Sequence, residues 1–267
     1  MAKRKINYLN NRDLLLEIHK SKNTFCYYTS KEYEDYDIIV YNVADITDEL
    51  IKQAKENRSD KVNRIIKENS DKNPKLTSSA DFDKLDLIFR VMDETHIPEE
   101  IRKNKKAKNL SNRERVVKLN FNPFKHYIFN ETGELVEVGR SHWSNGLENG
   151  GFCLSQGRLT NKLAMMFLKL VERYSQKGNW RGYTWLEDMK GQALMQLIDV
   201  ALKFDEAKSQ NPFAYFTCIV TNSFRGTLNS EDKVSTIKNK MMIESGYSPS
   251  HSYAMDNESG GSYNTYE

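Results

Sequence analysis

Three consecutive amphipathic segments between residues 159 and 229 constrain the fold of this chain more than any other feature. Apolar residues of the first segment recur at helical spacing, as Leu159, Leu163, Met166, Phe167, Leu170, Val171 and Tyr174. The second segment aligns Met189, Ala193, Leu197 and Ala201 on one face. The third opens with Asn211 as the expected N-cap and Pro212 at the first helical position. Three such helices with short connectors predict a compact helical domain.

The third segment, NPFAYFTCIVTNSFRGTLN, has two different faces. One is expected to be core and carries Phe213, Phe216, Val220 and Phe224. The opposite face carries Tyr215, Cys218, Ile219, Asn222 and Arg225, and the chain has no acidic residue between Glu206 and Glu231. A ring that stacks on a base, an amide that contacts a base edge and a cation for phosphate or guanine suit nucleic acid. The same face suits a protein contact equally well.

A polar, sparsely charged face also follows the second segment. It carries Asp188, Gln192, Gln196 and Asp199 at steps of three and four residues. This pattern is compatible with a solvated surface or with docking onto a pair of partner helices.

The rest of the chain gives weaker and mixed signals. We expect a helix at 6–20 capped by Asn10 or Asn11, a strand within 38–43, and a charged helix after that strand. A further helix is expected at 81–92. A strand pair at 121–140, joined by the turn 130–134, should then be followed by a linker or mobile loop at 144–157. The predicted fold is mainly α, with a small α+β insertion. The predicted parts are an N-terminal helical segment (1–23), the insertion (24–157), the helical domain (158–240) and an acidic disordered tail (241–267).

Composition excludes several classes of protein. The 40 basic and 37 acidic residues give a net charge of only +3, with basic clusters at 3–5 and 102–108 that are compatible with plain solvated surface. Cys26, Cys153 and Cys218 form no CxxC pair, which argues against a disulfide scaffold or zinc ribbon and favours a reducing compartment. No apolar run approaches the ~20 residues of a membrane span, so no membrane partner is expected. The chain also lacks the familiar hydrolase, metalloprotease and nucleotide-binding motifs, so we expect no enzyme activity, cofactor or metal.

The order LTNKLAMMFLKLVERYS, LEDMKGQALMQLIDVALKFD, NPFAYFTCIVTNSF resembles region 2 of bacterial sigma factors over about seventy residues. With the N-terminal KINYLNNRDLLLEI and the segments KFDEAKSQNPFAYFT and NSFRGTLN, the chain is more specifically similar to late-transcription sigma factors of T-even-like phages. In that family, the helix ending in a KF-type motif binds the clamp helices of the β′ subunit of RNA polymerase. The aromatic helix after it melts the minus-ten promoter element.

The resemblance implies roles for individual residues. Asp188 and Gln192 fall where the family contacts the polymerase clamp, although Gln192 replaces the common acidic residue there. Tyr215 falls where an aromatic residue captures the flipped adenine, and Asn222 and Arg225 fall where the family reads the upstream duplex edge. Cys218 and Ile219 replace the tryptophan pair that primary sigma factors insert at the fork.

The partners implied are host core RNA polymerase and AT-rich promoter DNA, in the host cell cytoplasm. No second helix-turn-helix follows residue 230, so a short minus-ten-like element without a minus-thirty-five element is the expected target. Late sigma factors of this group also end in a hydrophobic and acidic motif that binds the DNA sliding clamp. The tail here has Tyr253, Met255, Tyr263 and Tyr266 without a leucine–phenylalanine core, so the clamp and a late co-activator are further candidate partners.

Two other hypotheses stay open on the sequence alone. The acidic run Glu32, Glu34, Asp35 and Asp37 could hold magnesium in a DNA-processing nuclease, although such a run is more often a solvated loop. The helical block could also belong to an adaptor of RNA polymerase that contacts protein only.

Overall fold

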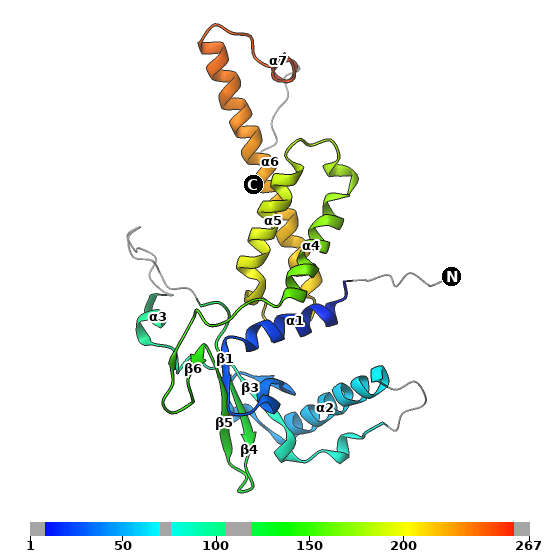
Figure 1. Cartoon of the computed structure of the whole chain (residues 1–267), viewed down its shortest axis with the longest axis vertical. Helices are drawn as coiled ribbons and strands as arrows, with labels where there is room; N and C mark the ends of the chain where they lie inside the picture. Colours follow the sequence, from blue (N-terminus) through cyan, green and yellow to red (C-terminus); the bar gives the residue numbers. More distant parts are fainter. Residues whose placement is uncertain (1–8, 70–75, 105–118, 259–267) are drawn as a thin grey trace, which may run out of the picture. The chain divides into compact units, whose positions relative to one another are not determined.

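A computed structural model describes residues 9–69, 76–104 and 119–258 (Figure 1). The chain is mainly helical and divides into two compact units. Unit 1 comprises residues 1–164 and 200–212, and unit 2 comprises residues 165–199 and 213–267. The basic cluster expected at 3–5 and residues 105–108 of the cluster expected at 102–108 lie outside the described residues. No helix in the described ranges is both long and apolar enough to cross a bilayer.

Unit 1 is built on a five-stranded sheet. Its strands are β1 (Cys26–Tyr28), β2 (Ile38–Val40), β3 (Ile88–Val91), β4 (Lys125–Phe129) and β5 (Leu135–Ser141), in the spatial order β1-β5-β4-β3-β2. Among the described strands of this sheet, β2 and β3 pair in parallel and the other neighbours pair antiparallel. A separate two-stranded sheet joins β6 (Trp143–Ser144) to β7 (Gly151–Phe152), within the segment expected to be a linker. The predicted strand at 38–43 and the strand pair around the turn 130–134 are confirmed.

Two helices of unit 1 match the sequence prediction, and a third, α3, was not predicted. Helix α1 (Asn11–Asn23) is capped by Asn10, whose side chain accepts a hydrogen bond of 2.7 Å from the backbone N–H of Asp13. Helix α2 (Asp48–Asn69) is the expected charged helix, and α3 (Glu99–Asn104) is short. Ile51 and Ala54 of α2 pack on Leu87 and Phe89, so α2 covers one face of the sheet.

The helix expected at 81–92 is wrong. Two short 3-10 turns, Ser79–Asp81 and Lys84–Asp86, lead into strand β3, all four residues of which are buried. Successive residues of a strand point to opposite faces of the sheet. Phe89 therefore packs on α2, while Arg90 points to the other face and contacts His19 of α1.

Unit 2 contains most of α4 (Asn161–Ser175) and α5 (Leu186–Val200), together with α6 (Pro212–Glu244) and α7 (His251–Glu258). The predicted core stripe of α5 is confirmed: Met189, Ala193 and Leu197 have no exposed surface. The rings of Phe167 and Phe216 meet edge to face at 4.8 Å. Phe224 packs against both Tyr174 and Trp180 at 5.1 Å, so aromatic contacts join α4 to α6.

Helix α6 is much longer than expected, at 33 residues or about 50 Å. It ends in a Schellman turn in which Gly246 adopts a φ of 80° and donates to Ile243, while Tyr247 donates to Met242. Helix α7 follows, so residues 241–258 are not the disordered tail that composition predicts. The remainder of that tail, 259–267, lies outside the described residues.

Candidate functional site

The predicted DNA-contacting face of α6 lies opposite its buried face. Phe216, Val220 and Phe224 are fully buried. Cys218, Asn222 and Arg225 are exposed, and Tyr215 and Ile219 are half-buried. The expectation that Phe213 belongs to the core is wrong, because its side chain is 39 % exposed in the first turn of α6.

The local chemistry of this face is polar and free of carboxylates. Tyr215 packs edge to face on Phe216 at 5.3 Å, and burial raises the pKa of its phenol, which therefore stays a protonated hydrogen-bond donor at neutral pH. Asn222 donates to the Cys218 sulfur at 3.7 Å, and none of the ion pairs among the described residues uses Arg225. The face can thus offer an aromatic edge, an amide and a cation to one ligand.

The predicted polymerase-contacting face of α5 is exposed over most of its length. Asp188, Gln192 and Asp199 are exposed, while Gln196 lies at the edge of the face and is half-buried. Sequence reasoning missed two apolar residues here: Met195 is 63 % exposed and Ile198 is 52 % exposed. Met195 follows Gln192 by three residues and Asp188 by seven, so it sits in the middle of the polar face. Exposed apolar residues within a polar rim are typical of a protein-docking surface.

A glycine on the same side of α5 leaves the helix backbone open. A Cβ atom built on Gly191 would meet no atom within 4 Å. A glycine inside an exposed helix costs roughly 0.5–1 kcal/mol relative to alanine, and it lets another chain approach the backbone closely. The open space beside Gly191 is consistent with a partner that packs tightly on α5.

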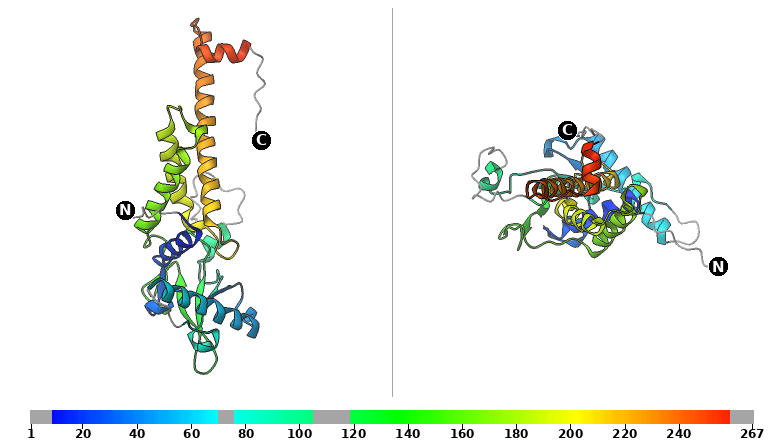
Figure 2. Two further views of the ribbon diagram at one scale, coloured as in Figure 1. Left: turned by 90° about the vertical axis from the view of Figure 1, so that its right-hand side faces the viewer. Right: turned by 90° about the horizontal axis from the view of Figure 1, so that it is seen from above.

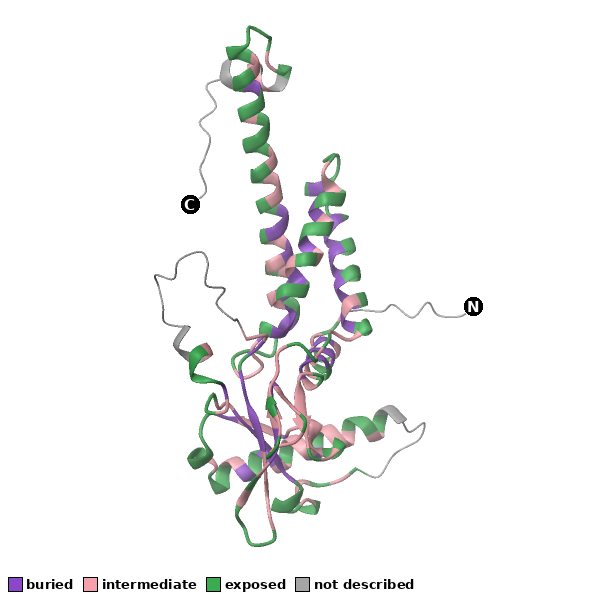
Figure 3. Cartoon of the chain, turned by 60° about the vertical axis from the view of Figure 1, so that its left-hand side comes forward, coloured by how far each residue is buried: buried purple, intermediate pink, exposed green. Residues whose placement is uncertain are grey.

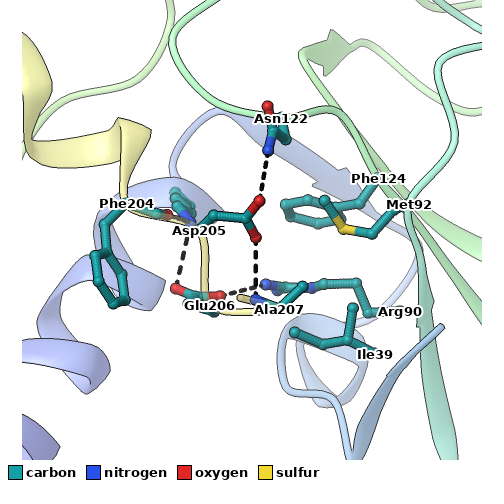
Figure 4. Close-up of a pocket in the computed structure, with 10 residues that line it drawn as sticks. Ile39, Arg90, Met92, Asn122, Phe124, Phe204, Asp205, Glu206 and Ala207 are labelled. Carbon is teal, nitrogen blue, oxygen red and sulfur yellow. Dashed lines mark hydrogen bonds and ion pairs between the residues drawn. The ribbon is translucent and has the colours of Figure 1, made fainter. Parts of the chain in front are cut away.

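The connector between α5 and α6, residues 200–212, belongs to unit 1, where buried charges hold it (Figure 4). Lys22 of α1 donates to the Phe204 carbonyl at 2.8 Å. The Glu206 carboxylate pairs with Arg90 at 2.9 Å and with Lys22 at 3.4 Å, and it accepts a hydrogen bond from Tyr36 at 3.2 Å. Helix α1, the 24–157 segment and this connector all belong to unit 1.

Arg90 is the centre of this buried network. Its guanidinium lies between the rings of Tyr36 and Phe124, at 3.8 and 3.9 Å from their centroids. It donates to His126 Nε2 at 3.0 Å, while His126 Nδ1 lies 2.7 Å from the Tyr33 carbonyl, so His126 is neutral with its proton on Nδ1. Burial and the nearby Arg90 charge lower the pKa of His19 to about 3 and hold that of His126 well below its usual value.

This network is a structural anchor for the connector. The residues around it enclose only about 10 Å³ of free space, which is room for no more than one water molecule. Its polar groups also hydrogen-bond one another, as Figure 4 shows for Arg90 with Glu206 and for Asn122 with Asp205. The cluster therefore positions the chain before α6 and offers no room for a substrate.

Two acidic residues of the run at 32–37 pair with cations of α2, although only Asp37 is buried and both Glu32 and Asp35 are exposed. Asp37 is buried, pairs with Arg58 at 3.0 Å and accepts a hydrogen bond from the backbone N–H of Ile88 at 3.0 Å. Asp35 pairs with Lys61 at 3.3 Å. Across the described ranges, no three histidine, cysteine or carboxylate side chains converge on a point that could hold a metal ion.

Comparison with known proteins identified no relative. No family model matches this chain, and no curated protein or solved structure is similar enough to match it.

Proposed function

We propose that this protein is a promoter-specificity subunit of the sigma type, acting in phage late transcription. It binds host core RNA polymerase through the exposed face of α5, then recognises and melts a short AT-rich minus-ten-like element with the exposed face of α6. In this proposal it carries no catalytic residues of its own. The fold of unit 2 is proposed to be that of sigma region 2, on the sequence resemblance.

The observation that carries the proposal is the pairing of two exposed faces of different chemistry on one helical unit. The α5 face combines Asp188 and Gln192 with the exposed Met195, a mixture suited to a protein partner. The α6 face combines Tyr215, Asn222 and Arg225 without a carboxylate, a mixture suited to DNA. A promoter-opening subunit needs both surfaces.

Melting would follow from the balance of base-pair loss against new contacts. A·T-rich steps are easily unstacked, and stacking of one unpaired base on an aromatic side chain is worth about 1–3 kcal/mol. Tyr215 supplies that stacking surface, and Arg225 neutralises a phosphate of the strand it holds. The narrow Cys218 and Ile219 side chains stand where primary sigma factors have tryptophans, so Tyr215 carries a larger share of strand capture here.

The test is promoter opening on linear duplex DNA with a late-type AT-rich element, using core bacterial RNA polymerase with and without this protein. Permanganate reactivity of unpaired thymines reports opening. Thymine reactivity that needs both proteins supports the proposal. Core binding without any reactive thymine would favour the protein-only adaptor, and magnesium-dependent cleavage of the duplex without polymerase would favour the nuclease.

A further inference from the structure

The second half of α6 carries an apolar stripe that the described residues of unit 2 leave uncovered. Val234 is 56 % exposed, Ile237 57 % and Met241 61 %. Together with Met242 and Tyr247 they line an open hollow of about 410 Å³ along the helix. Figure 2 shows this part of α6 extending past α4 and α5, and Figure 3 shows it largely exposed.

This stripe continues the core seam of the same helix. Seam positions follow one another at alternating steps of four and three residues: Phe216, Val220, Ser223, Thr227, Ser230, Val234, Ile237 and Met241. That spacing is the heptad pattern that packs one helix on another. In the first half of the seam, Phe216 is covered by an aromatic residue of α4. From Val234 onward, the described residues leave the seam exposed. The occupant that fits the open half is therefore another helix.

The charges beside the stripe indicate what kind of helix. Lys233, Lys238 and Lys240 flank it on both sides and are exposed, and no acidic residue lies between Asp232 and Glu244. In heptad terms these lysines take the positions that pair across a two-helix seam. A second copy of α6 would set lysine against lysine in either a parallel or an antiparallel pair, which is unfavourable.

We propose that the segment Val234–Met241 of α6 is a docking site for an amphipathic helix of a partner protein that has an apolar seam flanked by glutamate or aspartate. This site goes beyond the proposed promoter function, since it uses neither the Asp188 face of α5 nor the Tyr215 face of α6. The turn after α6 leaves the stripe open: Asn239, on the other side of the helix, is buried and accepts a hydrogen bond from the Ser250 backbone at 2.9 Å.

The experiment uses the full chain and two synthetic 28-residue helical peptides with leucine and isoleucine at the seam. One peptide has glutamate at all flanking positions, and the other has lysine there. Fluorescence anisotropy at about 0.1 M salt is expected to show the acidic peptide binding at least about tenfold tighter. The triple change K233E/K238E/K240E should reverse that preference, and the double change V234S/I237S should abolish binding of either peptide.

Each variant keeps its fold in this account, because every changed side chain is exposed; circular dichroism melting is the control. Equal affinity for the two peptides, or no binding of either, overturns the proposal. A dimer detected by sedimentation and dissociated by V234S/I237S would also overturn the proposal. So would binding of duplex DNA that K233E/K238E/K240E abolishes and with which the acidic peptide does not compete.

Discussion

Tyr215 is the residue on which the promoter-opening proposal depends most. Replacing it by alanine removes a stacking surface worth about 1–3 kcal/mol, so open-complex formation should fall by about 5- to 150-fold. Core binding should not change, because Tyr215 lies on α6 and not on the α5 face. Permanganate footprinting and core-binding anisotropy measure the two quantities separately.

Tyr41→Ala is the matched control for that experiment, since Tyr41 is 57 % exposed and belongs to unit 1. It should leave opening unchanged, and Tyr215→Phe should retain most activity because the ring persists. A Tyr215→Ala protein that loses core binding and opening to the same extent would remove the stacking role.

Arg90 and Glu206 form a buried ion pair whose loss should destabilise unit 1. Glu206→Gln leaves two buried cations, Arg90 and Lys22, without their carboxylate and should lower the free energy of unfolding by about 3–5 kcal/mol, whereas Arg90→Met leaves Glu206 paired with Lys22 and should cost less. The double variant should lose less than the sum, because the second change removes the stranded partner. Urea unfolding measures all three values.

An exposed pair provides the control for the buried one. Lys84 and Asp48 lie 3.4 Å apart with both side chains more than half exposed, so Lys84→Met should cost at most about 1 kcal/mol. Strict additivity of the two Arg90 and Glu206 changes would mean that these residues do not act as a pair.

At the scale of single elements, the exposed face of α5 makes a prediction about polymerase binding. Met195→Arg places a long charged side chain in the middle of that face and should weaken core binding by more than about tenfold. The fold should not suffer, because Met195 is 63 % exposed.

The matched control is Met165→Arg on α4, where the methionine is 53 % exposed. It should bind core polymerase like the unchanged protein. Equal loss of binding in both variants, or in neither, would move the interface away from α5.

Helices were the elements that the sequence predicted well, because their apolar residues repeat at helical spacing and their caps are explicit. Asn10 and Pro212 begin α1 and α6 as expected. Strand β3 was mistaken for a helix because Leu85, Ile88 and Phe89 also fit helical spacing, and only burial on both sides of the sheet distinguishes it. The extension of α6 was missed because the stripe of Val234, Ile237 and Met241 is diluted by polar neighbours.

At the scale of the whole molecule, residues far apart in the sequence form contacts in the structure that the sequence does not predict. Arg90 and Glu206 are 116 residues apart, and neither position alone predicts a buried pair. Met195 and Ile198 were also missed as site residues, because only the exposed fractions show that they face outward. Long-range partners and exposure depend on packing, which a single sequence does not report.

Four buried or half-buried histidines of unit 1 predict acid lability of the chain. Burial lowers the pKa of His19 and His142 to about 3 and that of His96 to about 4, and it holds the pKa of His126 well below its usual value. Arg90 adds to this effect at His19 and His126, Lys125 at His96, and His96 at His142. The folded state therefore keeps these rings neutral where the unfolded chain would protonate them.

This difference in proton binding sets the direction in which the free energy of unfolding changes with pH. Below about pH 6.5 the unfolded chain binds more protons, so stability falls as pH falls, by up to about 1.4 kcal/mol per pH unit for each histidine. The stabilising contribution of the four neutral histidines is fully present above pH 6.5 and is lost progressively as the pH falls toward 4. Urea unfolding at pH 8, 6.5, 5.5 and 4.5 measures this change in stability. A flat profile from pH 6.5 to 4.5 would contradict the neutral histidines.

The most direct test of the central claim is a gel shift with a fork-junction DNA, which carries an AT-rich duplex and one unpaired adenine at the expected minus-ten position. Core bacterial RNA polymerase is added with and without this protein. We predict a shifted complex that needs both proteins and is lost when the unpaired adenine is removed. A folded protein that binds core polymerase yet gives the same shift with fork and with plain duplex DNA would contradict the account.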